Sequence, residues 1–126
     1  MKAVILVFLG GGLGSLIRYW VSIAVKQQLD ARLNLLGTFT VNILGSLLIG
    51  LLMGWLFKTE SNYPNLQLLL VVGFCGGFTT FSSFSAENLN LLENKLYTEF
   101  LFYGLGSLLL GILAVFIGFL IIKLKV

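Results

Sequence analysis

The sequence contains no histidine, one cysteine and one proline in 126 residues. Histidine is the commonest metal ligand and the commonest proton shuttle, so its absence removes the usual basis of metal and acid–base sites. The single cysteine, Cys75, excludes an intrachain disulfide and a metal site built from several cysteines. The fold therefore contains no intrachain disulfide and no metal site built from histidines or several cysteines.

Charged residues are also scarce: they make up 10% of the chain, against 58% hydrophobic residues. Soluble domains carry roughly 25% charged residues, so these few charges cannot cover a water-facing surface. The same excess of apolar side chains excludes a disordered chain. No cluster among the eight basic residues is long enough to indicate a nucleic-acid partner. The composition indicates a small integral membrane protein.

Three long segments contain no charged residue: 33–57, 61–86 and 100–122. A fourth, 3–25, contains only Arg18. A helix needs roughly 20 apolar residues to cross the hydrocarbon core of a bilayer. We interpret 3–25 as a membrane helix rather than a cleaved signal peptide, because glycines and a charge interrupt it and no soluble domain follows. The sequence predicts an all-α membrane protein, a single domain over 1–126, with four transmembrane helices at about 3–25, 36–57, 66–92 and 97–123.

The basic residues are divided evenly between the two sides of the predicted bundle. With Arg18 snorkelling away from the termini, each side carries four. The positive-inside rule then fixes no orientation. This balance predicts insertion both ways up, and with it an antiparallel homodimer; a fixed orientation set by other features is the alternative. The terminal side carries Lys2, Lys58, Lys123 and Lys125, and the other side carries Arg18, Lys26, Arg32 and Lys95.

Small residues recur at helix-packing distances in all four segments. Membrane helices associate where small side chains let two backbones approach. In the fourth segment the spacing alternates between 3 and 4, as in a heptad seam, and predicts a dense contact within or between protomers. The seam consists of Gly104, Ser107, Gly111, Ala114 and Gly118, and the other segments carry the pairs Gly10–Gly14, Gly50–Gly54 and Gly73–Gly77.

The third segment contains an unusual string, Gly-Phe-Cys-Gly-Gly-Phe-Thr-Thr-Phe-Ser-Ser-Phe-Ser at 73–85. A glycine inside a helix costs about 1 kcal/mol relative to alanine, and here two adjacent glycines precede threonines and serines. We predict that the helix breaks near 76–80. A break at membrane depth leaves carbonyls that can bind a monovalent cation and N–H groups that can face an anion.

Polar side chains at membrane depth mark candidate sites, because an unsatisfied polar group there costs free energy. Thr38, Asn42 and Ser46 share one helix face at spacings of four residues. Asn42 either lines a pathway or forms an interhelical hydrogen bond, and the pattern does not decide between the two. Tyr103 and Ser107 repeat the spacing on the fourth helix, where Tyr103 alternatively marks the membrane interface.

Phe81 and Phe84 follow the predicted break on one helix face. The edge of a phenyl ring carries a partial positive charge, so both rings can contact an anion, although packing is the ordinary role of such a pair. Arg18 is the one cation near membrane depth. It either attracts anions into a vestibule or pairs with Glu87.

Acidic residues are absent from the interior of the first, second and fourth predicted helices, and Glu87 is the candidate in the third. This argues against a proton-coupled exporter of organic cations. The lack of a nucleophile–base pair argues against an enzyme. The remaining donors are amides, hydroxyls and ring edges, which suit a small anion. A small dual-topology multidrug or cation exporter and a non-transporting scaffold stay as alternatives.

Three strings resemble the CrcB/Fluc fluoride channels, with the same length, spans and motif order. They are Gly-Gly-Gly-Leu-Gly-Ser-Leu-Ile-Arg-Tyr at 10–19, Gly-Thr-Phe-Thr-Val-Asn-Ile-Leu-Gly at 37–45 and the string at 73–85. The resemblance implies a fluoride-selective channel in the inner (plasma) membrane that exports fluoride passively. It further implies an antiparallel, dual-topology homodimer with two pores, each lined by both protomers.

The resemblance also implies roles for individual residues. The carbonyls of Gly76 and Thr79 in both protomers match a central structural sodium site, and Arg18 matches the arginine of the family's first helix. Ser83 departs slightly from the family pattern, where many members carry threonine, but it keeps the hydroxyl. The residues assigned to the fluoride pore are Asn42, Phe81, Phe84, Ser83, Tyr103, Ser107 and Thr38.

Overall fold

The computed structural model describes residues 1–28, 35–59 and 63–124. Within them, four helical stretches are long and apolar enough to cross a membrane, and no strand occurs. The all-α fold with four apolar helices that the hydropathy predicts is confirmed. The spans are α1 (Lys2–Gln28), α2 (Leu35–Lys58), a composite third span over 64–93 and α6 (Tyr97–Leu124).

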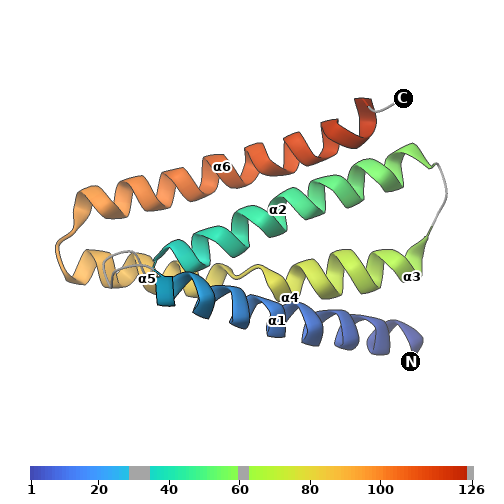
Figure 1. The fold of residues 1–126 in the computed structure, drawn as a ribbon, viewed down its shortest axis with the longest axis horizontal. Helices are drawn as coiled ribbons and strands as arrows, with labels where there is room; N and C mark the ends of the chain where they lie inside the picture. Colours follow the sequence, from blue (N-terminus) through green and yellow to red (C-terminus); the bar gives the residue numbers. More distant parts are fainter. Residues whose placement is uncertain (29–34, 60–62, 125–126) are drawn as a thin grey trace.

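The four spans lie lengthwise beside one another (Figure 1). The start of α1, the end of α2, the start of the third span and the end of α6 lie at one end, here called the terminal end. The turn that leads into α6 lies at the opposite end, here called the loop end. α2 packs mainly along α6, and α1 packs mainly along the third span. The third span also contacts α2, and its second half contacts α6, so it joins the two pairs.

The third span is broken, as the sequence predicts, and the break is narrower than expected. It begins with α3 (Pro64–Leu66), continues as a π-helix, η2 (Gln67–Cys75), and ends its first half as α4 (Gly76–Phe78). Thr79 and Thr80 are extended, and α5 (Phe81–Glu93) completes the span. The sequence pattern does not predict the π-helix. Such segments are rare and are frequent at functional sites.

Glycines allow α1 to touch the backbone of the third span directly. A Cβ atom on Gly10 would overlap the carbonyl oxygen of Leu69, and one on Gly14 would overlap that of Phe74. A Cβ atom on Gly77 would overlap the carbonyl oxygen of Gly11. Only hydrogen fits at these positions, so the glycines set the distance between α1 and the half-helices before the break.

The small-residue seam of α6 packs against α2 within the same chain. A Cβ atom on Gly118 would overlap the carbonyl oxygen of Leu47, and one on Gly50 would overlap that of Val115. Ala114 and Gly118 are buried. The dense contact that the seam predicts therefore lies inside the protomer at these positions.

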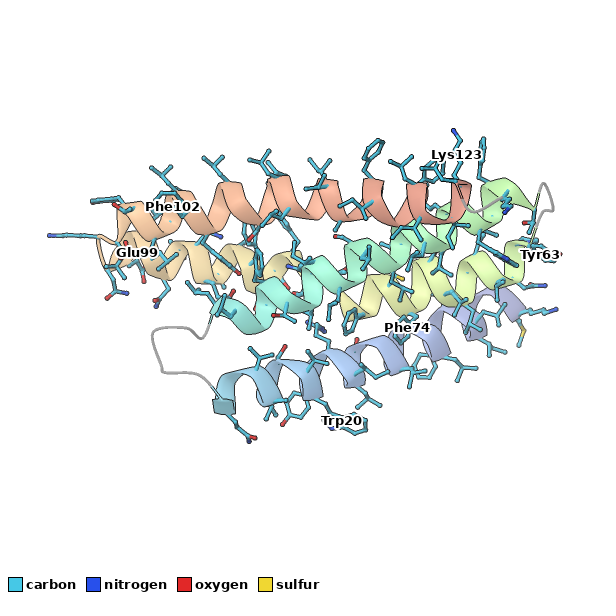
Figure 2. All side chains as sticks on the ribbon, turned by 45° about the horizontal axis from the view of Figure 1, so that its top comes forward. Trp20, Tyr63, Phe74, Glu99, Phe102 and Lys123 are labelled. Carbon is cyan, nitrogen blue, oxygen red and sulfur yellow. The ribbon has the colours of Figure 1, made fainter. Side chains whose placement is uncertain are left out.

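Large apolar side chains cover the outside of the bundle, as lipid contact requires. Phe8, Phe102 and Phe116 are exposed, and so is Trp20, which projects from α1 (Figure 2). At the terminal end, Trp55 stacks on Tyr63 with ring centroids 5.4 Å apart. Trp and Tyr are enriched where membrane and water meet, so these rings are consistent with a protein that crosses the membrane end to end.

The contact of α1 with the third span yields a first prediction. Replacing Gly14 by alanine drives a methyl group into the carbonyl oxygen of Phe74. We expect the free energy of unfolding to fall by about 1–3 kcal/mol, the usual effect of overpacking. Thermal unfolding of the purified protein in detergent measures it. Gly12→Ala is the matched control, because its added methyl group meets no atom within 4 Å; equal destabilisation by both variants would contradict the assigned contact.

Candidate functional site

The break is an extended dipeptide between two half-helices. Thr79 has φ −83° and ψ 160°, and Thr80 has φ −150° and ψ 115°. Thr80 also caps α5, because its Oγ1 accepts a hydrogen bond from the N–H of Ser83 at 3.2 Å. Threonine is a favoured N-cap residue because its hydroxyl replaces a missing backbone acceptor. The local sequence thus ends one helix and starts the next within two residues.

Asn42 of α2 binds both backbone groups of Thr80. Its Nδ2 donates to the carbonyl oxygen of Thr80 at 3.0 Å, and its Oδ1 accepts from the N–H of Thr80 at 2.7 Å. The interhelical hydrogen bond that the sequence left open is therefore present. An asparagine amide has two N–H groups, so one donor is left over, and Asn42 also lines the groove described next.

A groove of about 310 Å³ runs between α2, α5 and α6 beside the break. The rings of Phe81 and Phe84 lie 5.7 Å apart, centroid to centroid, and the Phe84 ring lies 5.3 Å from that of Tyr103. Phe81 is 79% exposed, so one side of the groove is open in the single chain. The groove is lined by Asn42, Ser46, Phe81, Phe84, Ser107, Leu108, Gly111, Ile112 and Val115.

The groove offers neutral hydrogen-bond donors and no charged side chain. The Ser107 hydroxyl oxygen is buried and has no hydrogen-bond partner in the part of the chain that the structure describes. Together with the spare N–H of Asn42, it can donate to a bound group. Ring edges add weak positive potential. Such a lining suits an anion that must lose water without being trapped by a full positive charge.

A second, more polar pocket of about 240 Å³ lies between α1, α2 and α5. It brings Arg18 together with Glu87, the acid that the sequence singled out. The Nε atom of Arg18 is buried and has no partner among the described residues, so this cation keeps a donor for another ligand. We call this space the polar pocket; it is lined by Ser15, Arg18, Tyr19, Ser22, Thr38, Thr80, Ser83 and Glu87.

Glu87 connects three helices near the polar pocket. One carboxylate oxygen accepts from the hydroxyl of Thr38 on α2 at 2.7 Å, and the other accepts from that of Tyr103 on α6 at 2.7 Å. The two hydroxyls are therefore donors to Glu87 rather than free donors. The Ser83 hydroxyl, in contrast, is an acceptor: it accepts a hydrogen bond from Thr80 Oγ1 at 3.1 Å.

The break releases the two carbonyls that the resemblance assigns to a sodium ion. In a continuous α-helix, the N–H of Thr80 would bond to the carbonyl of Gly76 and that of Ser83 to the carbonyl of Thr79. Here the first is diverted to Asn42 and the second to the Thr80 hydroxyl. Gly76 is exposed, and a Cβ atom built on it would meet no atom within 4 Å. Neutral carbonyl oxygens freed by a helix break suit a monovalent cation.

Ser46, Glu87 and Thr80 also belong to the site, although the sequence assigns none of them to the fluoride pore. Ser46 shares the candidate face of Thr38 and Asn42, so helical spacing already marks it. Glu87 is marked as an acid inside a membrane span and as a partner for Arg18. The role of Thr80 depends on its cap geometry, which the sequence does not display.

These features define a multi-pass helical membrane protein with a helix broken beside a groove of neutral donors and aromatic rings. Residues 5–119 match the family described as CrcB-like protein, Camphor Resistance (CrcB). The chain belongs to this family, as the three strings predict.

Several relatives carry the name fluoride-specific ion channel FluC. The relative from Phocaeicola vulgatus is 47% identical over 118 residues, which cover 94% of this chain and 96% of the relative. The relative from Gloeothece citriformis is 48% identical over 123 residues, 98% of each chain. The relative from Bacteroides fragilis is 48% identical over 120 residues, 94% of each chain. The similarity extends over almost the whole length of these proteins.

The pairing of Asn42 with Thr80 yields a second prediction. Asn42→Ala leaves an N–H and a carbonyl of Thr80 without partners, and an unsatisfied buried group costs about 1–3 kcal/mol. We expect the thermal unfolding midpoint to fall and the Thr80 amide to exchange its hydrogen faster. Ser46→Ala is the control, because Ser46 also lines the groove but has no hydrogen bond to the break among the described residues. Unchanged exchange at Thr80 in the Asn42 variant would contradict the pairing.

Proposed function

We propose that the protein is a fluoride-selective channel that lets fluoride leave the cell passively across the inner membrane. The groove beside the break is the observation that carries this proposal, because its donors are neutral and its walls are aromatic. Relatives 47–48% identical over nearly the whole chain are named fluoride-specific ion channels. Hydrogen fluoride is neutral and enters cells readily, so fluoride that it releases inside needs a route out.

Fluoride is small and strongly hydrated, so a selective path must replace its water with donors of moderate strength. The spare N–H of Asn42 and the hydroxyl of Ser107 provide such donors within the groove. The edges of Phe81 and Phe84 add attraction without a fixed charge. The N-terminus of α5, the positive end of its dipole, lies at the break and favours an anion there.

Glu87 tunes the hydroxyls next to the groove. Thr38 and Tyr103 donate hydrogen bonds to Glu87, so fluoride must compete with Glu87 for these two donors. The competition weakens binding to Tyr103 and prevents an ion from being held there. Arg18 in the polar pocket draws anions toward the same region, and Ser83 lies on its wall. The polar pocket serves as the vestibule of the pathway.

The single chain supplies only part of a closed pathway. The Phe81 ring is exposed, and a Cβ atom built on Gly76 would meet no atom within 4 Å. A second copy related by a two-fold axis in the membrane plane covers such a surface, and the even charge distribution permits the antiparallel orientation. The functional unit is then a dual-topology homodimer with two pores, each lined by both protomers.

A structural sodium ion belongs between the two breaks. The carbonyls of Gly76 and Thr79 from both copies would hold it, and these are the carbonyls that the break releases. When bound, sodium supplies positive charge near a pathway whose groove has no basic side chain. It also offsets the repulsion between carbonyl dipoles that face one another.

A small dual-topology exporter of organic cations is the second candidate. Glu87 favours it, because an acid in a polar pocket can bind a cation or a proton. The Glu87 side chain, however, already accepts hydrogen bonds from two hydroxyl groups. The groove beside it carries no acid, so fluoride is the better fit.

Ion release from proteoliposomes tests the proposal. Vesicles loaded with potassium fluoride and containing the purified protein are diluted into fluoride-free buffer with valinomycin, and a selective electrode records the fluoride. We expect fast release of fluoride and retention of chloride in parallel vesicles. Release no faster than from protein-free vesicles, or equal release of chloride, would sink the fluoride proposal. Uptake of an organic cation driven by a pH gradient would support the exporter.

The ring edges are tested by substitution. Phe84→Ile keeps an apolar side chain but removes the edge next to Tyr103. We expect fluoride release to slow roughly threefold to tenfold, as aromatic contacts are worth about 0.5–1.5 kcal/mol. The matched control is Phe102→Ile, which changes an exposed ring on α6 (Figure 2). An unchanged rate in the Phe84 variant would show that the ring only fills space.

A further inference from the structure

Asn88 on α5 is a buried polar residue that the groove and the polar pocket do not use. It is 8% exposed, and its Nδ2 donates to the carbonyl oxygen of Phe84, one turn earlier, at 2.8 Å. Its Oδ1 is buried and has no hydrogen-bond partner in the described part of the chain. A buried acceptor without a donor costs about 1–3 kcal/mol. An apolar residue of the same size would avoid that cost.

The unpartnered oxygen faces α6 at a glycine. A Cβ atom on Gly104 would lie 3.4 Å from Asn88 Oδ1, so the asparagine and the glycine are closely opposed. Cα–H groups are weak donors that commonly meet oxygens at helix–helix contacts. Asn88 therefore bonds to the Phe84 carbonyl on its own helix and lies close to α6 at Gly104.

The residues next to this contact are those of the proposed pathway. The carbonyl oxygen of Phe84 accepts the hydrogen bond from Asn88, and the Phe84 ring centroid lies 5.3 Å from that of Tyr103. Tyr103 precedes Gly104 in the sequence. The Tyr103 hydroxyl in turn donates to Glu87, the neighbour of Asn88. Any shift of α5 relative to α6 at Asn88 must move the Phe84 ring against Tyr103 and Ser107.

We propose that Asn88 is a positioning residue for the fluoride pathway: its amide fixes α5 on α6 and thereby the place of the Phe84 ring. The proposal rests on the proposed function. It explains why the chain keeps a polar group at a position where an apolar one would stabilise the fold. Positions that break a local rule of stability are characteristic of functional sites.

Two variants and one control test this role. Asn88→Leu replaces the amide by an apolar group of similar size, and Asn88→Ala removes it without overpacking. Asn90→Leu makes the same change at an exposed asparagine of α5. For each we measure thermal unfolding in detergent and the initial rate of fluoride release per folded protein in proteoliposomes.

We expect Asn88→Leu to unfold at the temperature of the unmodified protein or above it, because the unpartnered acceptor is gone. We expect fluoride release to slow roughly fivefold to tenfold in both Asn88 variants, the effect of losing one intramolecular hydrogen bond. Asn90→Leu should release fluoride at the unmodified rate. A purely structural asparagine would lower the unfolding temperature and leave the rate per folded protein unchanged.

The outcomes separate this proposal from the one on which it rests. If the unmodified protein releases no fluoride, the channel proposal fails and the role of Asn88 fails with it. If the unmodified protein releases fluoride and both Asn88 variants do so at the same rate, only the role of Asn88 is wrong. A rate that falls equally in Asn90→Leu would also overturn it, since the effect would not be specific to the buried contact.

Discussion

The side chain of Asn42 supplies the interaction on which the other features depend. A helix that breaks inside a membrane exposes backbone groups that no water can satisfy, and the Asn42 amide pairs with both such groups of Thr80. Because the N–H of Thr80 is bound in this way, the Gly76 carbonyl loses the donor that a continuous helix would give it, and α5 begins at Phe81. The neutral side chain of Asn42 thus stabilises the extended backbone of the break and also lines the groove beside it.

The remaining contacts hold the half-helices around that break. Glycines bring α1 onto the backbone of the first half, so its position is set by contact between main chains. The second half is held by side chains: Glu87 binds hydroxyls of α2 and α6, and Asn88 lies against Gly104. The first half is therefore fixed by close packing and the second by hydrogen bonds. The polar side chains that hold the second half, Glu87 and Asn88, therefore lie on the helix that borders the groove.

Much of the architecture follows from the sequence because it depends on local patterns. Uncharged segments of membrane length predict the four spans, and the Gly76–Gly77 pair before threonines predicts the break. The seam on α6 predicts a close contact, although spacing alone does not say that α2 is the partner. The π-helix over 67–75 was not predicted, since no periodicity of apolar residues distinguishes it in a segment that is apolar on every side.

The sequence predicts which residue types form the site, but it predicts only some of the hydrogen bonds between them. Helical spacing places Thr38 and Asn42 on one face, but the acceptor of Thr38 is on a different helix, 49 residues away. The same holds for the bond between Tyr103 and Glu87. Distances between helices depend on rotation about each axis, and a single sequence does not contain them. The sodium ion, the dimer and the pore roles of individual residues stay predictions.

The central claim is that fluoride binds in the groove beside the break, next to the Asn42 amide. Solid-state NMR of asparagine-labelled protein in liposomes measures it most directly, through ¹⁹F–¹⁵N dipolar dephasing between fluoride and side-chain amides. We predict one dephased amide signal at saturating fluoride, which disappears in Asn42→Ser. No dephased amide in a protein that releases fluoride, or a dephased signal that survives in Asn42→Ser, would contradict the account.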